Sequence, residues 1–207
     1  MRYVKFVFVP VVVVCLSQVV VLAELRAGVP TDQVRQTADQ VLTFLQDAQF
    51  KGAGKESQRR EKLRQIIGTR FDFEEMSKRS LGTHWRRVSR EEQQRFVQLF
   101  TDLLEKSYAD QIESYNGEKI TYGRENVTND QAEVDTKIVT KKGTEVTVNY
   151  KLRSEGGDWK VYDVVIENIS LVNNYRSQFN RILAKAPFNE LLKKLEAKSP
   201  EVQAARE

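Results

Sequence analysis

The sequence has few of the residues on which enzymes most often rely for catalysis. Its 207 residues include one cysteine, Cys15, and one histidine, His84. It contains no HExxH or CxxC motif and no glycine-rich phosphate loop, so zinc and thiol chemistry lack an evident set of ligands. His84 stands beside Trp85, where we expect a helix-end or surface residue rather than a general base. We therefore predict no metal site, no cofactor and no catalytic residue.

Residues 1–23 have the pattern of a secretory signal peptide. A positively charged start precedes an apolar run over residues 6–22, which a Ser-Gln pair interrupts. The run is at the lower end of the length that spans a membrane, so we predict cleavage after Ala23 and export of residues 24–207. An uncleaved membrane anchor is the alternative. The single cysteine would leave with the leader, and the exported chain would depend on no disulfide.

The charge balance argues against a nucleic-acid partner. The formal net charge is +4, from 33 basic and 29 acidic residues. Arg2 and Lys5 belong to the predicted signal peptide, so 33 less these two leaves 31 basic residues against 29 acidic ones. A chain so nearly neutral lacks the basic footprint of a nucleic-acid-binding protein. The exported part is long enough for one domain with a substantial core.

Helical patterns dominate the chain up to residue 115. Thr31 is placed to cap a first helix, and a second is predicted over residues 56–67, with Gly68 as its stop. The longest helix is predicted over residues 89–114, where Ser89 and Glu92 have the spacing of a capping box. Its broad apolar face consists of Phe96, Leu99, Phe100, Leu103, Leu104, Tyr108 and Ile112.

The pattern then changes to that of strands. Residues 119–122, 132–140 and 144–152 alternate apolar and polar side chains, and Asn129-Asp130 and Lys142-Gly143 separate them, which predicts antiparallel hairpins. Trp159 to Ile166 is rich in bulky and β-branched residues and reads as a last strand. From Asn168 onward the apolar period becomes helical without a Gly or Pro break, through Val172, Tyr175, Phe179 and Ile182.

This order of elements predicts an α+β domain. We expect a helical part over about residues 30–115, a sheet over about 118–166 and C-terminal helices over 168–197. The N-terminal helices and the long helix would pack on a curved, four-stranded antiparallel sheet, in an NTF2-like or cystatin-like architecture.

Two blocks of sequence carry a resemblance to a known family. One is WKVYDVVIENISLVNNYRSQF, over residues 159–179, and the other, over residues 71–115, is FDFEEMSKRSLGTHWRRVSREEQQRFVQLFTDLLEKSYADQIESY. Together they resemble the toluene-tolerance (Ttg2/MlaC) family, the periplasmic phospholipid-binding components of the Mla (maintenance of lipid asymmetry) ABC transport system. The likeness extends over nearly all of the chain after the leader.

The resemblance implies that sheet and helices enclose an apolar cavity for the acyl chains of a phospholipid, which is held as cargo. From periodicity alone, the same side chains would fill an ordinary core. The candidate cavity-wall residues are Phe71, Met76, Leu81, Trp85, Phe96, Phe100, Leu103, Leu104, Tyr108, Val146, Val148, Tyr150, Val161, Val165, Val172, Tyr175 and Phe179.

The resemblance also implies a monomeric, non-enzymatic shuttle in the periplasm. Its partners would be an inner-membrane ABC transporter with an MCE-domain subunit and an outer-membrane lipoprotein associated with a porin. A basic cluster around Trp85 could dock on such partners, although a solvated helix surface is equally compatible with it. The candidate docking residues are Lys78, Arg79, Arg86, Arg87 and Arg90.

Two other functions are compatible with the residues. One is an NTF2-like enzyme or binder that acts on a small apolar molecule through Asp163 or Tyr175, and the other is a structural adaptor with a dry core. Asp163 lies among apolar residues of the last strand, so its carboxylate needs a partner. We expect an Arg or a Tyr hydroxyl at the sheet rim to pair with it, rather than a role as general base.

Overall fold

The computed structural model describes residues 30–50, 52, 54–115 and 117–197, and the predicted signal peptide lies outside this part of the chain. Within it, no helix combines the length and the apolar character that crossing a membrane requires. The helices are α1 (Pro30–Gln46), η1 (Ala48–Phe50), α2 (Glu56–Gly68), α3 (Phe73–Leu81), η2 (Gly82–Arg87), α4 (Arg90–Glu113), α5 (Leu171–Leu183) and α6 (Phe188–Glu196). The strands are β1 (Lys119–Thr128), β2 (Gln131–Val139), β3 (Glu145–Glu155), β4 (Asp158–Ile166) and β5 (Ile169–Ser170).

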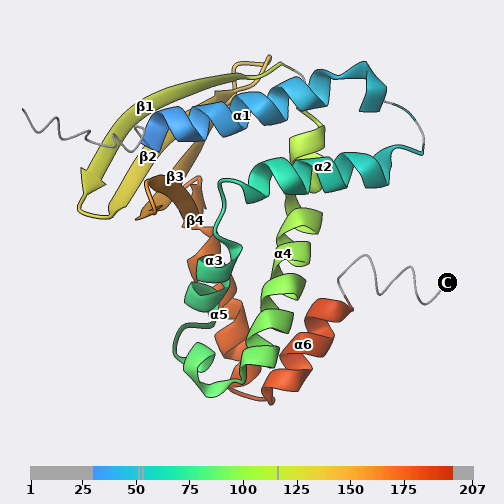
Figure 1. Cartoon of the computed structure of the whole chain (residues 1–207), viewed down its shortest axis with the longest axis vertical. Helices are drawn as coiled ribbons and strands as arrows, with labels where there is room; N and C mark the ends of the chain where they lie inside the picture. The colour runs from blue at the N-terminus through green and yellow to red at the C-terminus, as the bar shows by residue number, and fades with distance from the viewer. Residues whose placement is uncertain (1–29, 51, 53, 116, 198–207) are drawn as a thin grey trace, which may run out of the picture.

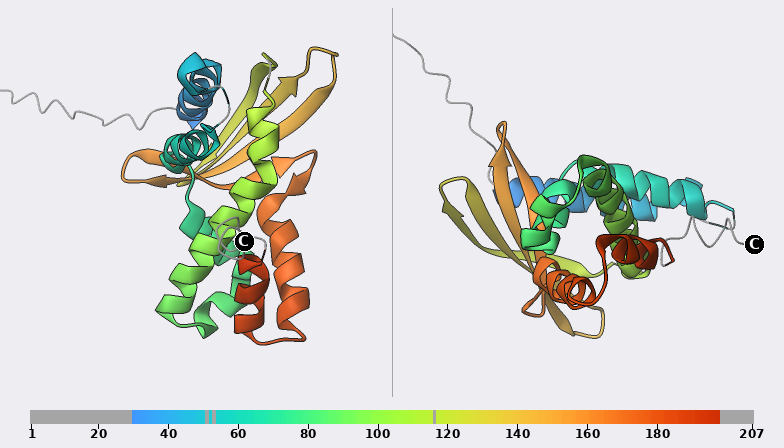
Figure 2. Two further views of the ribbon diagram at one scale, coloured as in Figure 1. Left: turned by 90° about the vertical axis from the view of Figure 1, so that its right-hand side faces the viewer. Right: turned by 90° about the horizontal axis from the view of Figure 1, so that it is seen from below.

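The fold has two parts, a sheet accompanied by α1 and α2, and a helical body below it (Figure 1). α1 packs against β1 and β2, whereas α3, α4, α5 and α6 pack on one another. α4 belongs to both parts, because it starts in the helical body and rises to the level of α2 and the sheet (Figures 1 and 2). The predicted α+β class is confirmed, and the long helix contributes mainly to the helical body.

The sheet is antiparallel throughout, and its strands follow the order of the chain from β1 to β5. β1 is longer than predicted and continues to Thr128, past an irregularity between Tyr122 and Glu125 that interrupts the alternation of side chains. Asn129, with φ 55°, forms the tight turn into β2, as its position between two alternating segments predicts. The sheet has five strands rather than the four predicted, since β5 adds a short edge.

The start of α5 differs from the predicted direct change from strand to helix at Asn168. Glu167 and Asn168 have left-handed φ angles of 47° and 65° and turn the chain back, so that β5 pairs with the end of β4. Ser170 then caps α5, and its hydroxyl accepts a hydrogen bond from the amide of Asn173 at 3.0 Å. Left-handed φ angles are uncommon for residues other than glycine, and this turn contains no glycine. The sequence therefore contains no sign of a turn at these two positions.

The start of α1 also differs from prediction, because Thr31 does not cap it. The helix begins at Pro30, whose fixed φ and missing N–H suit the first helical position. Thr31 lies inside the first turn, and its amide and hydroxyl both donate to Glu125 Oε2 of β1, at 2.7 and 2.5 Å. A carboxylate from a distant strand therefore satisfies one of the free backbone donors of this helix end.

The capping box predicted for α4 is confirmed. The Ser89 hydroxyl accepts from the amide of Glu92 at 3.2 Å, and the Glu92 carboxylate accepts from the amide of Ser89 at 2.8 Å. The first part of the apolar face that follows, from Phe96 to Leu104, is buried in the helical body. Rings from α4 and α5 meet edge to face, with Phe100 and Tyr175 centroids 5.0 Å apart and Phe96 and Phe179 centroids 5.4 Å apart.

Buried side chains form two separate apolar clusters rather than one core. The helical core joins α3, α4, α5 and α6, and it contains the aromatic rings of α4 and α5. The sheet cluster joins β2, β3 and β4 with Val34 of α1 and Leu171 at the start of α5. Phe71 and Tyr108 are partly buried and pack against both clusters, so they lie at the junction of the two parts.

Candidate functional site

Seven partly buried side chains pack against the sheet cluster. One of them, Phe71, lies just before α3, and we call the other six the open apolar face. One of the six comes from α4 and the others from β1, β2, β3 and β4. The strand register places those of the four strands on one side of the sheet. Apolar surface that remains in contact with water gives an apolar ligand a free energy to gain. The open apolar face consists of Tyr108, Tyr122, Ile138, Val146, Tyr150 and Ile166.

The first half of α1 covers the neighbouring part of the same sheet side. Val34 is buried in the sheet cluster together with Ala132 and Val134 of β2. Ile138, further along β2, pairs with Val146 of β3, and both of these side chains are only partly buried. The sheet side is therefore closed near the start of β2 and open toward its end.

Tyr150 lies deepest in the open apolar face. Burial raises the pKa of its hydroxyl to about 12, and the nearby Tyr122 contributes in the same direction. The side chain nevertheless keeps some contact with solvent. Tyr150 is thus largely, but not completely, surrounded by protein atoms. No hydrogen bond joins this hydroxyl to another described side chain, so its polar group is available to a ligand.

Tyr122 and Tyr108 give this face two further polar tips. Burial raises the pKa of both hydroxyls above the usual value of 10. The guanidinium of Arg35 from α1 lies 4.6 Å from the centre of the Tyr122 ring, a cation–π contact that holds the ring from one side. The open apolar face thus combines a wide apolar area with a few hydroxyls, a composition typical of small-molecule sites.

The structure divides the predicted cavity-wall residues between the two clusters. The sheet side contains Val146, Val148, Tyr150 and Val161. Phe71 and Tyr108 lie at the junction, and Trp85 is partly buried against the helical core. The remaining predicted residues are buried within the helical core, apart from Val165, and they are Met76, Leu81, Phe96, Phe100, Leu103, Leu104, Val172, Tyr175 and Phe179.

Val165 faces away from the apolar side of the sheet, which corrects its predicted place on the cavity wall. The pairing of β3 with β4 shifts after Lys151, so that Leu152 pairs with Val161 while Lys151 pairs with Asp163. This bulge changes the parity of β4. As a result Val164 and Ile166 share the apolar side, and Val165 pairs with Asn149 on the other.

Three residues of the open apolar face were missed by sequence reasoning. Tyr122 ends the first predicted strand, Ile138 is the last residue but one of β2, and Ile166 ends β4. The sequence did contain a signal for these three residues. Each stands two or four residues from an inward-facing neighbour on the same strand, and such residues lie on the same side of a sheet. Periodicity alone could not show that these strand ends are only partly covered.

Asp163 and Tyr175 both serve structural contacts. Asp163 is buried, and its carboxylate accepts from the Ser170 hydroxyl at 2.6 Å and from the Val172 amide at 3.1 Å. It therefore holds the N-terminus of α5, where a negative charge is favourable. The partner is thus a helix end and not the Arg or Tyr predicted. Tyr175 packs between Phe100 and Phe179 in the helical core.

The predicted docking cations fall into two groups. Lys78 and Arg79 both pair with Glu75, at 3.1 and 2.8 Å, and the Arg79 guanidinium lies 4.0 Å from the centre of the Tyr162 ring. Arg86, Arg87 and Arg90, in contrast, are exposed and form no ion pair with the part of the chain that the structure describes. These last three, on η2 and at the start of α4, are free to meet an acidic partner.

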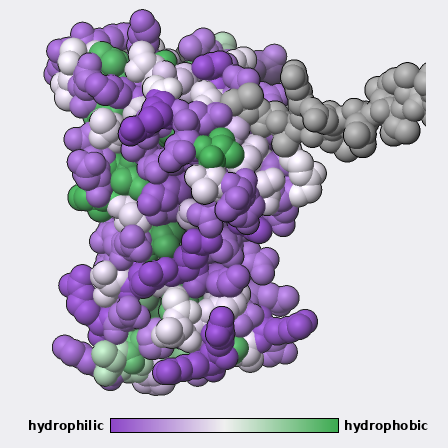
Figure 3. Space-filling model, turned by 90° about the vertical axis from the view of Figure 1, so that its left-hand side faces the viewer, coloured by the Kyte–Doolittle hydropathy of each residue, from purple (hydrophilic) through white to green (hydrophobic). Residues whose placement is uncertain are grey.

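An open groove of about 1070 Å³ follows α1 and α2, and its lining combines Phe44 and Ile66 with polar side chains, among them Asp32, Arg35 and Lys62. The face of the molecule in Figure 3 is mainly hydrophilic, with hydrophobic residues in small scattered groups. Over the described ranges, no group of three or more His, Cys, Asp or Glu side chains is arranged to hold a metal ion.

Comparison with known proteins agrees with the resemblance seen in the sequence. Toluene tolerance protein Ttg2D of Pseudomonas putida is 26% identical over 188 residues, which cover 90% of this chain and 87% of that protein. The intermembrane phospholipid transport system binding protein MlaC of Haemophilus influenzae is 24% identical over 168 residues, covering 79% of this chain and 78% of that protein.

The fold has a counterpart among solved structures. A phospholipid-binding protein from Ralstonia solanacearum, solved in complex with a phospholipid, superposes with a TM-score of 0.76 at 23% sequence identity. The match covers 84% of this chain and 99% of that chain, and it shows a shared fold. A family model described as MlaC protein matches residues 35–197, which is most of the sequence. The chain therefore belongs to the MlaC family.

Proposed function

We propose that this protein is a periplasmic phospholipid carrier that moves lipid between an outer-membrane complex and an inner-membrane ABC transporter and so maintains the lipid asymmetry of the outer membrane. The observation that carries the proposal is the open apolar face, in which partly buried apolar side chains of the sheet and Tyr108 of α4 pack against the sheet cluster. Family relatives described as a phospholipid transport binding protein and as a phospholipid-bound structure support it.

The proposed mechanism is carriage without covalent chemistry. A diacyl lipid with two chains of about fifteen methylenes gains on the order of 20 kcal/mol when both chains leave water, at roughly 0.8 kcal/mol per methylene. Only a site that covers most of both chains competes with a bilayer. The open apolar face supplies one wall of such a site, and the hydroxyls of Tyr108, Tyr122 and Tyr150 supply polar contacts for ester or headgroup oxygens.

The shuttle role requires export and two docking events. Cleavage of the predicted signal peptide after Ala23 would release the chain into the periplasm. Arg86, Arg87 and Arg90 would then meet acidic surfaces on an MCE-domain subunit at the inner membrane or on a lipoprotein–porin complex at the outer membrane. The open apolar face belongs to the sheet part of the fold and these cations to the helical body, so docking need not cover the lipid site.

Native mass spectrometry of the exported protein tests the binding proposal. The protein purified from its host in mild conditions should carry diacyl phospholipid, identified by extraction and fragmentation of the bound species. Transfer of a labelled phospholipid from outer-membrane vesicles to inner-membrane vesicles, with and without the protein, tests the shuttle role. A chain that is folded but empty, and that takes up no lipid from vesicles, would contradict the proposal.

A further inference from the structure

α1, η1 and α2 form an arm that is anchored firmly to the sheet at one end, and we call it the α1–α2 arm. Thr31 at the start of α1 donates twice to Glu125. Gln33 accepts from the amide of Trp159 at 2.9 Å and also from the buried Arg70, which itself donates to the Trp159 carbonyl at 2.7 Å. Both the first turn of α1 and the chain that follows α2 are therefore tied to the sheet.

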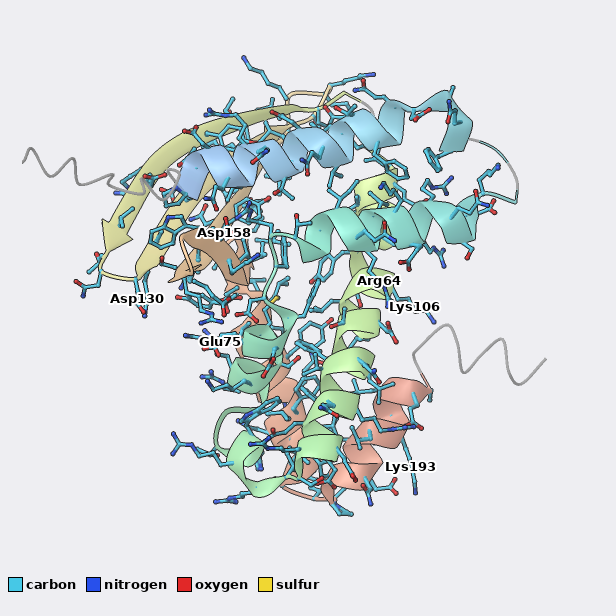
Figure 4. All side chains as sticks on the ribbon, in the orientation of Figure 1. Arg64, Glu75, Lys106, Asp130, Asp158 and Lys193 are labelled. Carbon is cyan, nitrogen blue, oxygen red and sulfur yellow. The ribbon has the colours of Figure 1, made fainter. Side chains whose placement is uncertain are left out.

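At its other side the arm meets α4 through ion pairs, which we call the arginine latch. Arg59 pairs with Glu113 at 2.5 Å, and Arg64 pairs with Asp102 at 2.5 Å and with Glu105 at 2.6 Å. Figure 4 shows Arg64 where α2 passes α4. The three acids lie on α4 and the two arginines on α2, so all the attraction of the latch acts across the two helices.

In the part of the chain that the structure describes, no residue of α2 belongs to, or packs against, either of the two apolar clusters. Leu63 is the one buried residue of α2, and it belongs to neither the helical core nor the sheet cluster. Phe44, near the end of α1, is likewise buried outside both clusters and packs against Phe50 of η1, with ring centroids 4.7 Å apart and ring planes tilted by 52°. The far part of the arm thus has its own small apolar contact, while its fastening to α4 is ionic.

The latch borders the proposed lipid site. Tyr108 of the open apolar face follows Glu105 by one helical turn and precedes Glu113, so the latch acids lie on both sides of it along α4. Tyr122 of β1, another residue of the face, contacts Arg35 in the anchored half of α1. Movement of α2 away from α4 would therefore widen the approach to the open apolar face at its Tyr108 edge, while the anchored start of α1 stayed on the sheet.

We propose that the α1–α2 arm is the gate of the lipid site and that the arginine latch sets the rate at which lipid enters and leaves. This inference rests on the proposed function. Ion pairs near the surface are individually weak, depend on salt and form and break without loss of apolar packing. Such a fastening suits a carrier that must hold its lipid in water and release it at a membrane complex whose own charges compete for the latch.

Charge reversal at the latch tests the inference. Arg64→Glu places a third carboxylate against Asp102 and Glu105, so release of a fluorescent phosphatidylethanolamine to acceptor vesicles should become roughly five- to tenfold faster. The charge-swapped variant Arg64→Glu/Asp102→Lys/Glu105→Lys should return the rate toward that of the wild type. The matched control is Arg95→Glu, which breaks a 2.5 Å pair with Glu196 between α4 and α6, away from the arm.

Salt provides a second measurement that needs no variant. Raising ionic strength from 0.1 M to 1 M shortens the screening length from about 10 Å to about 3 Å, so release by the wild type should also accelerate. Arg64→Glu should show little of this salt dependence, whereas Arg95→Glu should keep it. Wild-type release rates in Arg64→Glu, or rates independent of salt, would overturn the latch while lipid occupancy still upheld the carrier. Absence of lipid binding in every variant, including the wild type, would remove both proposals.

Discussion

Substitution of Val146 by tryptophan is the most direct test of the open apolar face as a lipid wall. Val146 lies on β3, pairs with Ile138 and is only partly buried, so a larger side chain can extend over the face without displacing the sheet cluster. An indole would take the room of roughly four methylene groups of an acyl chain, at about 0.8 kcal/mol each. A loss of about 3 kcal/mol of binding free energy corresponds to a dissociation constant more than a hundredfold larger.

Two further tryptophan variants separate lipid binding from folding. Val148 is buried in the sheet cluster, so Val148→Trp should lower folding stability by about 1–3 kcal/mol through overpacking. The same substitution should also lower lipid occupancy. Val165 points to the other side of the sheet, so Val165→Trp should leave lipid occupancy unchanged. For a domain of this size, each 1 kcal/mol moves the thermal midpoint by about 2–4 °C.

Lipid occupancy and thermal midpoint are measured on the same preparations. The expected pattern is loss of lipid alone in Val146→Trp, loss of both lipid and stability in Val148→Trp, and loss of neither in Val165→Trp. Full lipid occupancy in Val146→Trp, or an equal loss in Val165→Trp, would refute the assignment of this sheet side to the lipid.

Three other substitutions test separate parts of the structure. Asp163→Ala should lower the free energy of unfolding by about 2 kcal/mol in urea titrations, because the Val172 amide loses its buried acceptor, and lipid occupancy should persist if the residue is not catalytic. In an absorbance titration of tyrosinate, Tyr150→Phe should remove the group that ionises at about pH 12. Folding raises the pKa of Tyr150 above the value of 10 of a free tyrosine, so the contribution of Tyr150 to the free energy of unfolding is present below pH 10 and is lost as the pH rises through 12. Reversal of charge at Arg86 and Arg87 should slow association with an MCE-domain subunit severalfold and flatten its salt dependence, and unchanged association rates would remove these residues from the docking surface.

Local signals in the sequence predicted those elements that local contacts determine. The capping box at Ser89 and Glu92 lies within one turn of α4. The alternation of side chains in β2 and β3 reflects an apolar side of the sheet and a polar side that faces solvent. The start of α1 could not be predicted in the same way, because Glu125, far along the chain, supplies the acceptor for Thr31. Long-range partners of this kind leave no local pattern.

The site residues show a similar division. Periodicity identified inward-facing side chains but could not separate the helical core from the sheet cluster, since both have the same apolar composition. Val165 was misplaced because one bulge reverses the parity of β4. The latch was overlooked for another reason, because Arg59 and Arg64 occupy a helix whose polar sequence suggests an exposed surface, and only the fold brings their acidic partners opposite them.

The separation of the two apolar clusters has a consequence for how this protein can change. Phe71 and Tyr108 are the partly buried side chains that contact both clusters, so most substitutions in one cluster leave the other untouched. Effects of distant, unshared sites add nearly independently. Cargo preference could therefore drift through exchanges at the ends of β2 and β3 while the helical body keeps the chain folded. The same independence would let a helical body from one relative be joined to the sheet of another, with lipid choice following the sheet.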